Sequence, residues 1–192
     1  FLTIILAGVG SAQSQISTCQ ELQSIEDNPN SNYELSNDID CSDTENWNNG
    51  NGFDPIDDFS GELDGNSYRI TELYINRPNE DDVGLFGSSF TGEITDTRFI
   101  EADVVGDGFV AVVAGTRDNY DITNVIVLDS KIEGSSSYVG GIAGRPTGSI
   151  TDSSVIDTDV EMRSSSSYTA GLAARPSSAT IQRTRVIGGS VT

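Results

Sequence analysis

The fold is decided between Val83 and Thr192, where one short block recurs as Gly84-Leu85-Phe86-Gly87, Val112-Val113-Ala114-Gly115, Gly141-Ile142-Ala143-Gly144 and Gly171-Leu172-Ala173-Ala174. Successive blocks are offset by 28, 29 and 30 residues, from 85 to 113, 142 and 172. Apolar residues follow each block in three matching series: Ile94, Ile122, Ile150 and Ile181; Phe99, Val127, Val155 and Val186; and Val104, Ile132, Val160 and Val191. A fixed period of this length is typical of repeat proteins, whose units bury their apolar faces against their neighbours.

The composition of the repeats favours strands over helices. The units are rich in Val, Ile, Thr, Ser and Gly, whereas helical repeats need long stretches of good helix formers. Their apolar residues alternate, as Val125 and Val127 do, which is the strand period. We therefore predict an all-β protein, a parallel β-helix of about three short strands per coil of 28–30 residues, with equivalent residues stacked in ladders.

The charge of the chain narrows the classes of partner. The chain has thirty acidic and ten basic residues, which gives a formal net charge of −20. Nucleic acids and anionic membranes both require cationic patches, so neither is an expected partner. Lys131 is the only lysine. An acidic surface poor in lysine suits a protein kept soluble in concentrated salt, as in a halophilic archaeon; a generic acidic secreted protein is the alternative.

Cys19 and Cys41 are the only cysteines, and the chain has no histidine. A zinc or iron–sulfur site is therefore not expected. We predict a disulfide that pins the N-terminal segment, with two free buried thiols as the alternative. A disulfide would indicate an oxidising, extracellular setting.

The first residues form an apolar extension, which we assign to residues 1–17. The run from Phe1 to Gly10 is too short to span a membrane as a helix. It is interpreted as a strand donated to a neighbouring subunit, a strand packed on its own chain, or the remnant of a secretory leader. In the first interpretation the subunit contacts are made by the large apolar side chains of Phe1, Leu2, Ile4, Ile5, Leu6 and Val9.

Residues 18–58 are predicted to form an N-terminal cap and an acidic loop, ahead of the repeats at 59–192. Thr18 and Glu21 fit a capping box, which predicts a short helix over residues 19–25. An alternating strand is expected over 33–40, with Tyr33, Leu35 and Ile39 facing inward. The loop carries the calcium candidates Asp43, Glu45, Asp54 and Asp57. Their spacing matches no EF-hand, and a solvated acidic loop is the alternative.

Several polar or aromatic positions also recur with the repeat. Phe109, Tyr138 and Tyr168 form an aromatic row, interpreted as a structural edge or as a platform for sugars. Two acidic rows contain Glu101, Asp129 and Asp157, and Asp96, Asn124 and Asp152, which must face water, salt or a cation because like charges repel. Arg145 and Arg175 recur with Arg117 nearly aligned; we expect them to neutralise carboxylates, with a partner-binding stripe as the alternative.

The stretch Phe59-Ser60-Gly61-Glu62-Leu63-Asp64-Gly65-Asn66, followed by Ile70, Leu73, Ile75 and the Val83-Gly84-Leu85-Phe86-Gly87 block, resembles GLUG-motif repeat proteins of bacterial and archaeal surface adhesins. The resemblance covers about residues 17 to 192. It implies a right-handed parallel β-helix on the outside of a cell. The motif residues are structural, so the resemblance implies no catalytic residue.

These observations predict a non-catalytic extracellular structural protein, a subunit of a cell-surface filament or adhesin. Because the pattern stops in mid-repeat at Val191-Thr192, we expect head-to-tail assembly of identical copies through β-strand addition. Surface glycans are further candidate partners. The alternatives are a β-helix enzyme acting on acidic polysaccharide and a calcium- or glycan-binding adhesion module that does not polymerise.

Overall fold

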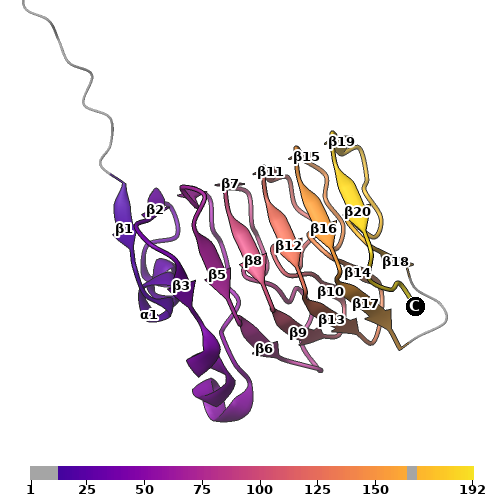
Figure 1. Cartoon of the computed structure of the whole chain (residues 1–192), viewed down its shortest axis with the longest axis horizontal. Coiled ribbons are helices and arrows are strands. Elements are labelled where there is room, and N and C mark those ends of the chain that lie inside the picture. Colours follow the sequence, from indigo (N-terminus) through magenta and orange to yellow (C-terminus); the bar gives the residue numbers. More distant parts are fainter. Residues whose placement is uncertain (1–12, 164–167) are drawn as a thin grey trace, which may run out of the picture.

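The protein is a stack of parallel coils, seen in a computed structural model that describes residues 13–163 and 168–192 (Figure 1). Its strands lie in four sheets, and every named strand pairs in parallel with the equivalent strand of a neighbouring coil. The architecture is the right-handed parallel β-helix that was predicted.

Three long sheets form the sides of the coils. The first contains β1 (Ser14–Ile16), β2 (Tyr33–Leu35), β4 (Glu62–Asp64), β7 (Glu93–Thr95), β11 (Asp121–Thr123), β15 (Ser149–Thr151) and β19 (Thr180–Gln182). The second contains β3 (Ile39–Asp40), β5 (Arg69–Thr71), β8 (Arg98–Ile100), β12 (Ile126–Leu128), β16 (Ser154–Ile156) and β20 (Arg185–Ile187). The third contains β6 (Tyr74–Asn76), β9 (Asp103–Gly106), β13 (Lys131–Gly134) and β17 (Asp159–Met162).

A fourth, short sheet adds to the three strands expected per coil. It contains β10 (Phe109–Val110), β14 (Tyr138–Gly140) and β18 (Tyr168–Ala170), so it exists only in the later coils. These strands precede the repeated glycine-containing blocks, and they hold the aromatic row in register, with Phe109 opposite Tyr138 and Tyr138 opposite Tyr168.

The strand register confirms the repeat read from the sequence. Ile122 pairs with Ile94 and Ile150, and Val127 pairs with Phe99 and Val155. The blocks themselves are joined by single bridges from Phe86 through Ala114 and Ala143 to Ala173. The earlier coil is also in the predicted register, because Ile70 and Ile75 pair with Phe99 and Val104.

The core runs along the axis as ladders of buried side chains. Most members of the three apolar series are fully buried up to Val160. A second feature is a stack of buried rings in which neighbouring centroids from Phe59 to Phe86, Phe90 and Tyr120 lie 4.7, 4.4 and 4.8 Å apart. Offset stacking of this kind adds to the apolar area that the coils bury against one another.

The two acidic rows occupy the corners of the coils. Glu101, Asp129 and Asp157 all have positive φ angles, and so do Asp96, Asn124 and Asp152. This left-handed conformation is tolerated best by glycine and by short polar residues such as Asn and Asp. Beside one corner, Ser130 Oγ accepts the backbone N–H of Ala102 at 3.0 Å, which satisfies a buried donor. The recurrence of acidic residues therefore reflects backbone geometry as well as solvent exposure.

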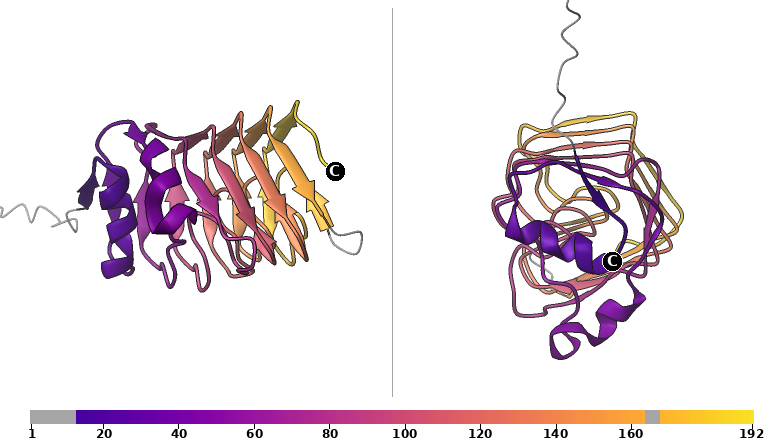
Figure 2. Two further views of the ribbon diagram at one scale, coloured as in Figure 1. Left: turned by 90° about the horizontal axis from the view of Figure 1, so that it is seen from below. Right: turned by 90° about the vertical axis from the view of Figure 1, so that its left-hand side faces the viewer.

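The N-terminal end of the stack is covered by a helix. The helix α1 (Cys19–Gln23) continues into a 3-10 turn, η1 (Ser24–Asp27), and its capping box at Thr18 and Glu21 is formed as predicted. Leu22 and Ile25 are fully buried against the first coils. Seen from the N-terminal side, α1 lies across the end of the coils (Figure 2). The predicted disulfide between Cys19 and Cys41 ties this helix to the end of β3.

Two segments differ in detail from the sequence prediction. The single strand expected over 33–40 is divided into β2 and β3, because the chain turns a corner of the coil between them; Tyr33, Leu35 and Ile39 all still face inward. In the segment assigned to the extension, residues 14–16 form β1 and pair with β2 of the same chain. The predicted boundaries after residues 17 and 58 do not divide the fold, because the sheets continue past both positions.

Candidate functional site

The four calcium candidates are distributed over two parts of the surface. Asp43 and Glu45 lie on η2 (Ser42–Gly50), a 3-10 segment interrupted by non-helical residues at 47–49. Asp54 forms an ion pair with Arg77 at 3.0 Å, and Asp57 Oδ1 accepts the backbone N–H of Ser88 at 2.7 Å. The structure thus brings Asp54 and Asp57 together and leaves Glu45 elsewhere.

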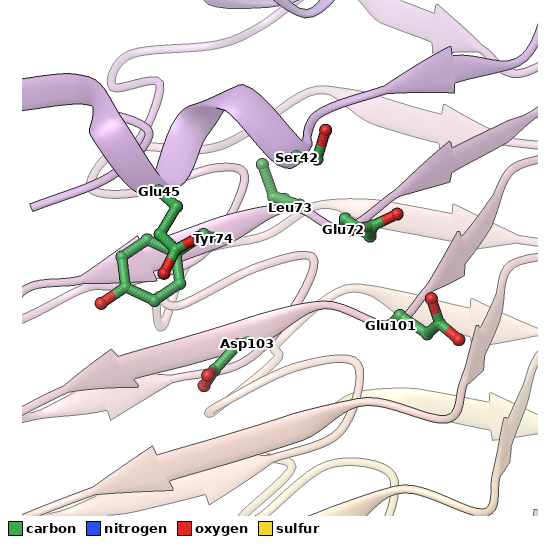
Figure 3. A pocket seen from close by; sticks show the side chains of 7 residues that line it. All are labelled: Ser42, Glu45, Glu72, Leu73, Tyr74, Glu101 and Asp103. Carbon is green, nitrogen blue, oxygen red and sulfur yellow. The ribbon is translucent and has the colours of Figure 1, made fainter. Parts of the chain in front are cut away.

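Glu45 lines a cavity of about 290 Å³ beside η2, with Ser42, Glu72, Leu73, Tyr74, Glu101 and Asp103. Glu72 and Glu101 lie on one side of the hollow and Glu45 on the other (Figure 3). One oxygen of Asp103 is buried and has no hydrogen-bond partner in the described part of the chain. The carboxylates line one hollow but do not converge on one point.

A second acidic cavity, of about 160 Å³, is lined by Asp54, Pro55, Asp57, Glu80, Asp81, Asp82 and Ser88. Burial, reinforced by the neighbouring carboxylate of Asp81, raises the pKa of Asp82 to about 6. Its Oδ1 atom is buried without a hydrogen-bond partner among the described residues. The run from Glu80 to Asp82 is not among the sites predicted from the sequence. Aligning Ile56 with Phe86, its partner in the next coil, would have placed Asp57 beside this run.

No group of three or more acidic, histidine or cysteine side chains in residues 13–163 and 168–192 has an arrangement that could hold a metal ion. The two acidic cavities offer the hard oxygen ligands that calcium prefers. However, Asp54 already pairs with Arg77 and Asp57 already accepts a backbone bond. Calcium binding at Asp43, Glu45, Asp54 and Asp57 therefore stays a prediction.

A different surface, the arginine–aromatic row, consists of Phe109, Tyr138 and Tyr168 with Arg117, Arg145 and Arg175. The ring centroids of Phe109 and Tyr138 lie 5.1 Å apart, and those of Tyr138 and Tyr168 lie 5.4 Å apart, with interplanar angles of 20° and 10°. The rings are therefore stacked face to face along the axis. Parallel pairing of β10, β14 and β18 sets this spacing.

Each arginine of the row lies over a ring. The guanidinium carbon of Arg117 is 5.9 Å from the centroid of Phe109, and that of Arg145 is 5.6 Å from the centroid of Tyr138. Arg175 lies 4.8 Å from the centroid of Tyr168, and its Nη1 donates to the hydroxyl of Tyr138 at 3.0 Å. Cation–π contacts of this kind stabilise a positive charge that has no anionic partner.

We expected these arginines to neutralise carboxylates, but the structure shows no ion pair between any of them and a carboxylate in the described part of the chain. Among the described residues, none of the three has a carboxylate oxygen within 4.0 Å. Arg145 Nε is buried and lacks an acceptor there. The positive charge of Arg117 lowers the pKa of Asp82, but burial raises that pKa by more. The repeat spacing predicted the alignment of the arginines, but not which groups they contact.

The coil at the C-terminal side of the structure has a partly exposed core edge. Val127 and Val155 are buried, but Val186, the next member of that ladder, is 51% exposed. Val191, which continues the ladder of Ile132 and Val160, is 48% exposed. In the described part of the chain no strand pairs with the outer edges of β18, β19 or β20, at the yellow end of Figure 1.

The predicted subunit contacts at Phe1, Leu2, Ile4, Ile5, Leu6 and Val9 lie outside the described residues. Within the described residues, no helix has the length and apolar character needed to cross a membrane.

Comparison with known proteins gives two relatives by sequence, and no protein-family model matches the chain. Halomucin of Haloquadratum walsbyi is 37% identical over 155 residues, which is 74% of this chain and 2% of Halomucin. A "Putative Gly-rich membrane protein" of Evansella cellulosilytica is 31% identical over 110 residues, 55% of this chain and 10% of that protein. The chain therefore spans a small part of the length of each relative.

One solved structure has the same fold. The crystal structure of a "putative immunoglobulin A1 protease" from Bacteroides ovatus matches 96% of this chain and 80% of its own, with a TM-score of 0.50 and 15% sequence identity. At this identity the similarity concerns the arrangement of the coils, and function must be argued from the surfaces of the present protein.

Proposed function

We propose that this chain is a non-catalytic extracellular structural protein, part of a cell-surface filament or adhesin, that joins other copies head to tail through β-strand addition. The observation that carries the proposal is the regular stack of parallel coils, which matches part of Halomucin over 74% of this chain. The edge of such a sheet is a template for an added strand.

The N-terminal helix supports strand addition over direct stacking of coils. At the N-terminal side, α1 lies across the coils and is pinned by the disulfide between Cys19 and Cys41 (Figure 2). A second copy would therefore present a helix, not an open coil, at that side. The uncharged apolar run at residues 1–10 has the composition of a strand that could reach past the helix. Such a head-to-tail contact does not close and generates a fibre.

Three observations support an extracellular location. The disulfide is typical of oxidising compartments. The match to Halomucin covers most of the present chain. The net charge of −20 suits a surface exposed to concentrated salt, as in a halophilic archaeon.

The absence of catalysis is also part of the proposal. The acidic rows at 101, 129 and 157 and at 96, 124 and 152 repeat with the corners of the coils, where positive φ angles favour short polar residues. Paired carboxylates for acid–base chemistry would instead form one irregular cluster around a substrate. Cleavage of a uronate polymer by the purified protein would contradict the proposal.

Assembly is tested on residues 1–12. Deletion of this segment should abolish filaments in negative-stain electron micrographs, and circular dichroism should show that the coils remain folded. The matched control is Thr3→Ser together with Ser11→Thr, which keeps every large apolar side chain of the segment.

The control variant should form filaments as the unaltered protein does. Filaments from the protein lacking residues 1–12 would contradict donation of that segment. A protein that stays monomeric in light scattering at all concentrations tested would contradict assembly altogether.

A further inference from the structure

We propose that the arginine–aromatic row, defined above by Arg117, Arg145 and Arg175 with Phe109, Tyr138 and Tyr168, is a binding site for a short acidic glycan whose sugars carry carboxylates. The site goes beyond the proposed assembly, because it lies on the sides of the coils and does not use residues 1–12. Binding and assembly can therefore be separated by experiment.

The row gathers most of the positive charge that is not paired with a carboxylate. The chain has ten basic residues and thirty acidic ones. In the described part of the chain five of the ten form an ion pair with a carboxylate: Arg69, Arg77, Lys131, Arg163 and Arg183. Three of the remaining five lie in this one row, aligned along three successive coils of an acidic protein.

The row is preorganised for an anion. Equivalent positions on neighbouring coils lie about 4.8 Å apart, so the guanidinium groups repel one another. The rings hold them in place at 4.8 to 5.9 Å. A ligand with anionic groups repeated along the axis would relieve this repulsion.

The polar groups of the row define the chemistry of the ligand. A guanidinium group binds a carboxylate through two parallel hydrogen bonds, and the hydroxyls of Tyr138 and Tyr168 can bond to sugar hydroxyls. Single-stranded nucleic acid needs exposed ring faces on which bases stack. Here the faces of Tyr138 are covered by the neighbouring rings at 5.1 and 5.4 Å. These features favour an acidic sugar over a nucleic acid.

A neighbouring acidic cavity limits the length of the ligand. Asp82 precedes Val83, which bridges to Val110, and so lies in the coil before Phe109 at the start of the aromatic row. The acidic cavity that contains Asp54, Asp57 and Asp82 therefore borders the row on its N-terminal side. Carboxylates there would repel an anionic chain that extended further, which favours a ligand of a few sugars.

The test uses trigalacturonate as the probe and isothermal titration calorimetry as the measurement, with maltotriose and a short oligothymidylate for comparison. Arg145→Gln with Arg175→Gln should weaken trigalacturonate binding at least about tenfold, the effect of losing one charge-assisted contact. The matched control, Arg69→Gln with Arg183→Gln, removes two charges that pair with Asp38 and Asp152 outside the row. It should change the affinity less than about twofold, allowing for the small effect of a distant charge.

Several outcomes would overturn the site. These are no heat of binding with trigalacturonate, an equal loss in the two double variants, and equal affinity for maltotriose or oligothymidylate. Circular dichroism melting checks that each variant is folded. Filaments should still form from the variant Arg145→Gln with Arg175→Gln. If the protein does not assemble, the glycan measurement can still be interpreted; if it does not bind the glycan, the assembly measurement can still be interpreted.

Discussion

At the scale of single residues, Asp82 is the clearest case of a side chain whose site favours its neutral form. It lies in the acidic cavity with Asp54, Asp57 and Asp81, and one of its oxygens is buried without a partner among the described residues. Burial and like charge both raise its pKa, to about 6. The folded protein therefore binds a proton at Asp82 more tightly than the unfolded chain does.

This shift has a direct consequence for the pH dependence of stability. Between about pH 4 and pH 6 the folded state holds more protons at Asp82 than the unfolded state, so this residue lowers stability as the pH rises through that window. Asp82→Asn keeps the shape of the protonated acid and tolerates the positive φ. We expect it to raise the free energy of unfolding by about 1 kcal/mol at pH 8, after allowing for partial solvent exposure, and to have little effect at pH 4.

Urea denaturation of both proteins across this pH range measures the effect. Asp43→Asn is the matched control, since it removes one carboxylate from an exposed position of the same acidic protein. A gain of the same size in the control would assign the effect to general charge repulsion. A gain at Asp82 that does not depend on pH would show that the charge of this carboxylate is not the cause.

At the scale of elements, the N-terminal cap differs from the coils because it is held by a covalent bond. Helix α1 has only five residues, which is too short to be stable by itself. Its capping box, the burial of Leu22 and the disulfide between Cys19 and Cys41 together fix it across the first coils. The cap covers an end of the stack whose strand edges would otherwise be open.

We expect the variant Cys19→Ala with Cys41→Ala to lose about 3 kcal/mol of stability, the chain-entropy effect of opening a loop of this size. The two cysteines are 22 residues apart. Urea denaturation with and without reductant measures it. Reductant should destabilise the unaltered protein by a similar amount and leave the variant unchanged. If reductant has no effect on the unaltered protein under conditions that free both thiols, the disulfide does not stabilise the cap.

At the scale of the whole molecule, the dominant property is negative charge spread along a rod. Each coil repeats acidic corners close to those of its neighbours, and the net charge is −20. Repulsion among these groups opposes the compact state and is screened by salt, because the Debye length falls from about 10 Å at 0.1 M to about 3 Å at 1 M. The protein should therefore be most stable at high ionic strength.

We expect the melting temperature at pH 8 to rise when sodium chloride is increased from 0.05 M to 2 M, measured by circular dichroism at fixed protein concentration. At pH 4 many carboxylates are protonated, so the same increase in salt should raise the melting temperature less. A rise of equal size at both pH values would assign the effect to salting-out of apolar surface instead of charge screening.

The sequence by itself determined the coils and their register. The 28–30-residue period aligned Ile94 with Ile122 and Ile150, and in a parallel stack equivalent residues must lie one inter-strand distance apart. The capping box and the isolated pair of cysteines likewise predicted the short helix and the disulfide, because both depend on local or unique partners.

Only the tertiary structure decided what the polar side chains contact. Arg145 and Arg175 lie over aromatic rings instead of beside carboxylates, and Asp54 and Asp57 meet the run at 80–82 instead of Glu45. The repeat specifies which coil and which row a residue occupies. The direction of a long side chain depends on the corner at which it lies, on the fourth strand and on the neighbouring coil. The geometry of these features differs from one coil to the next. The contacts of a long polar side chain therefore follow from the packed structure alone.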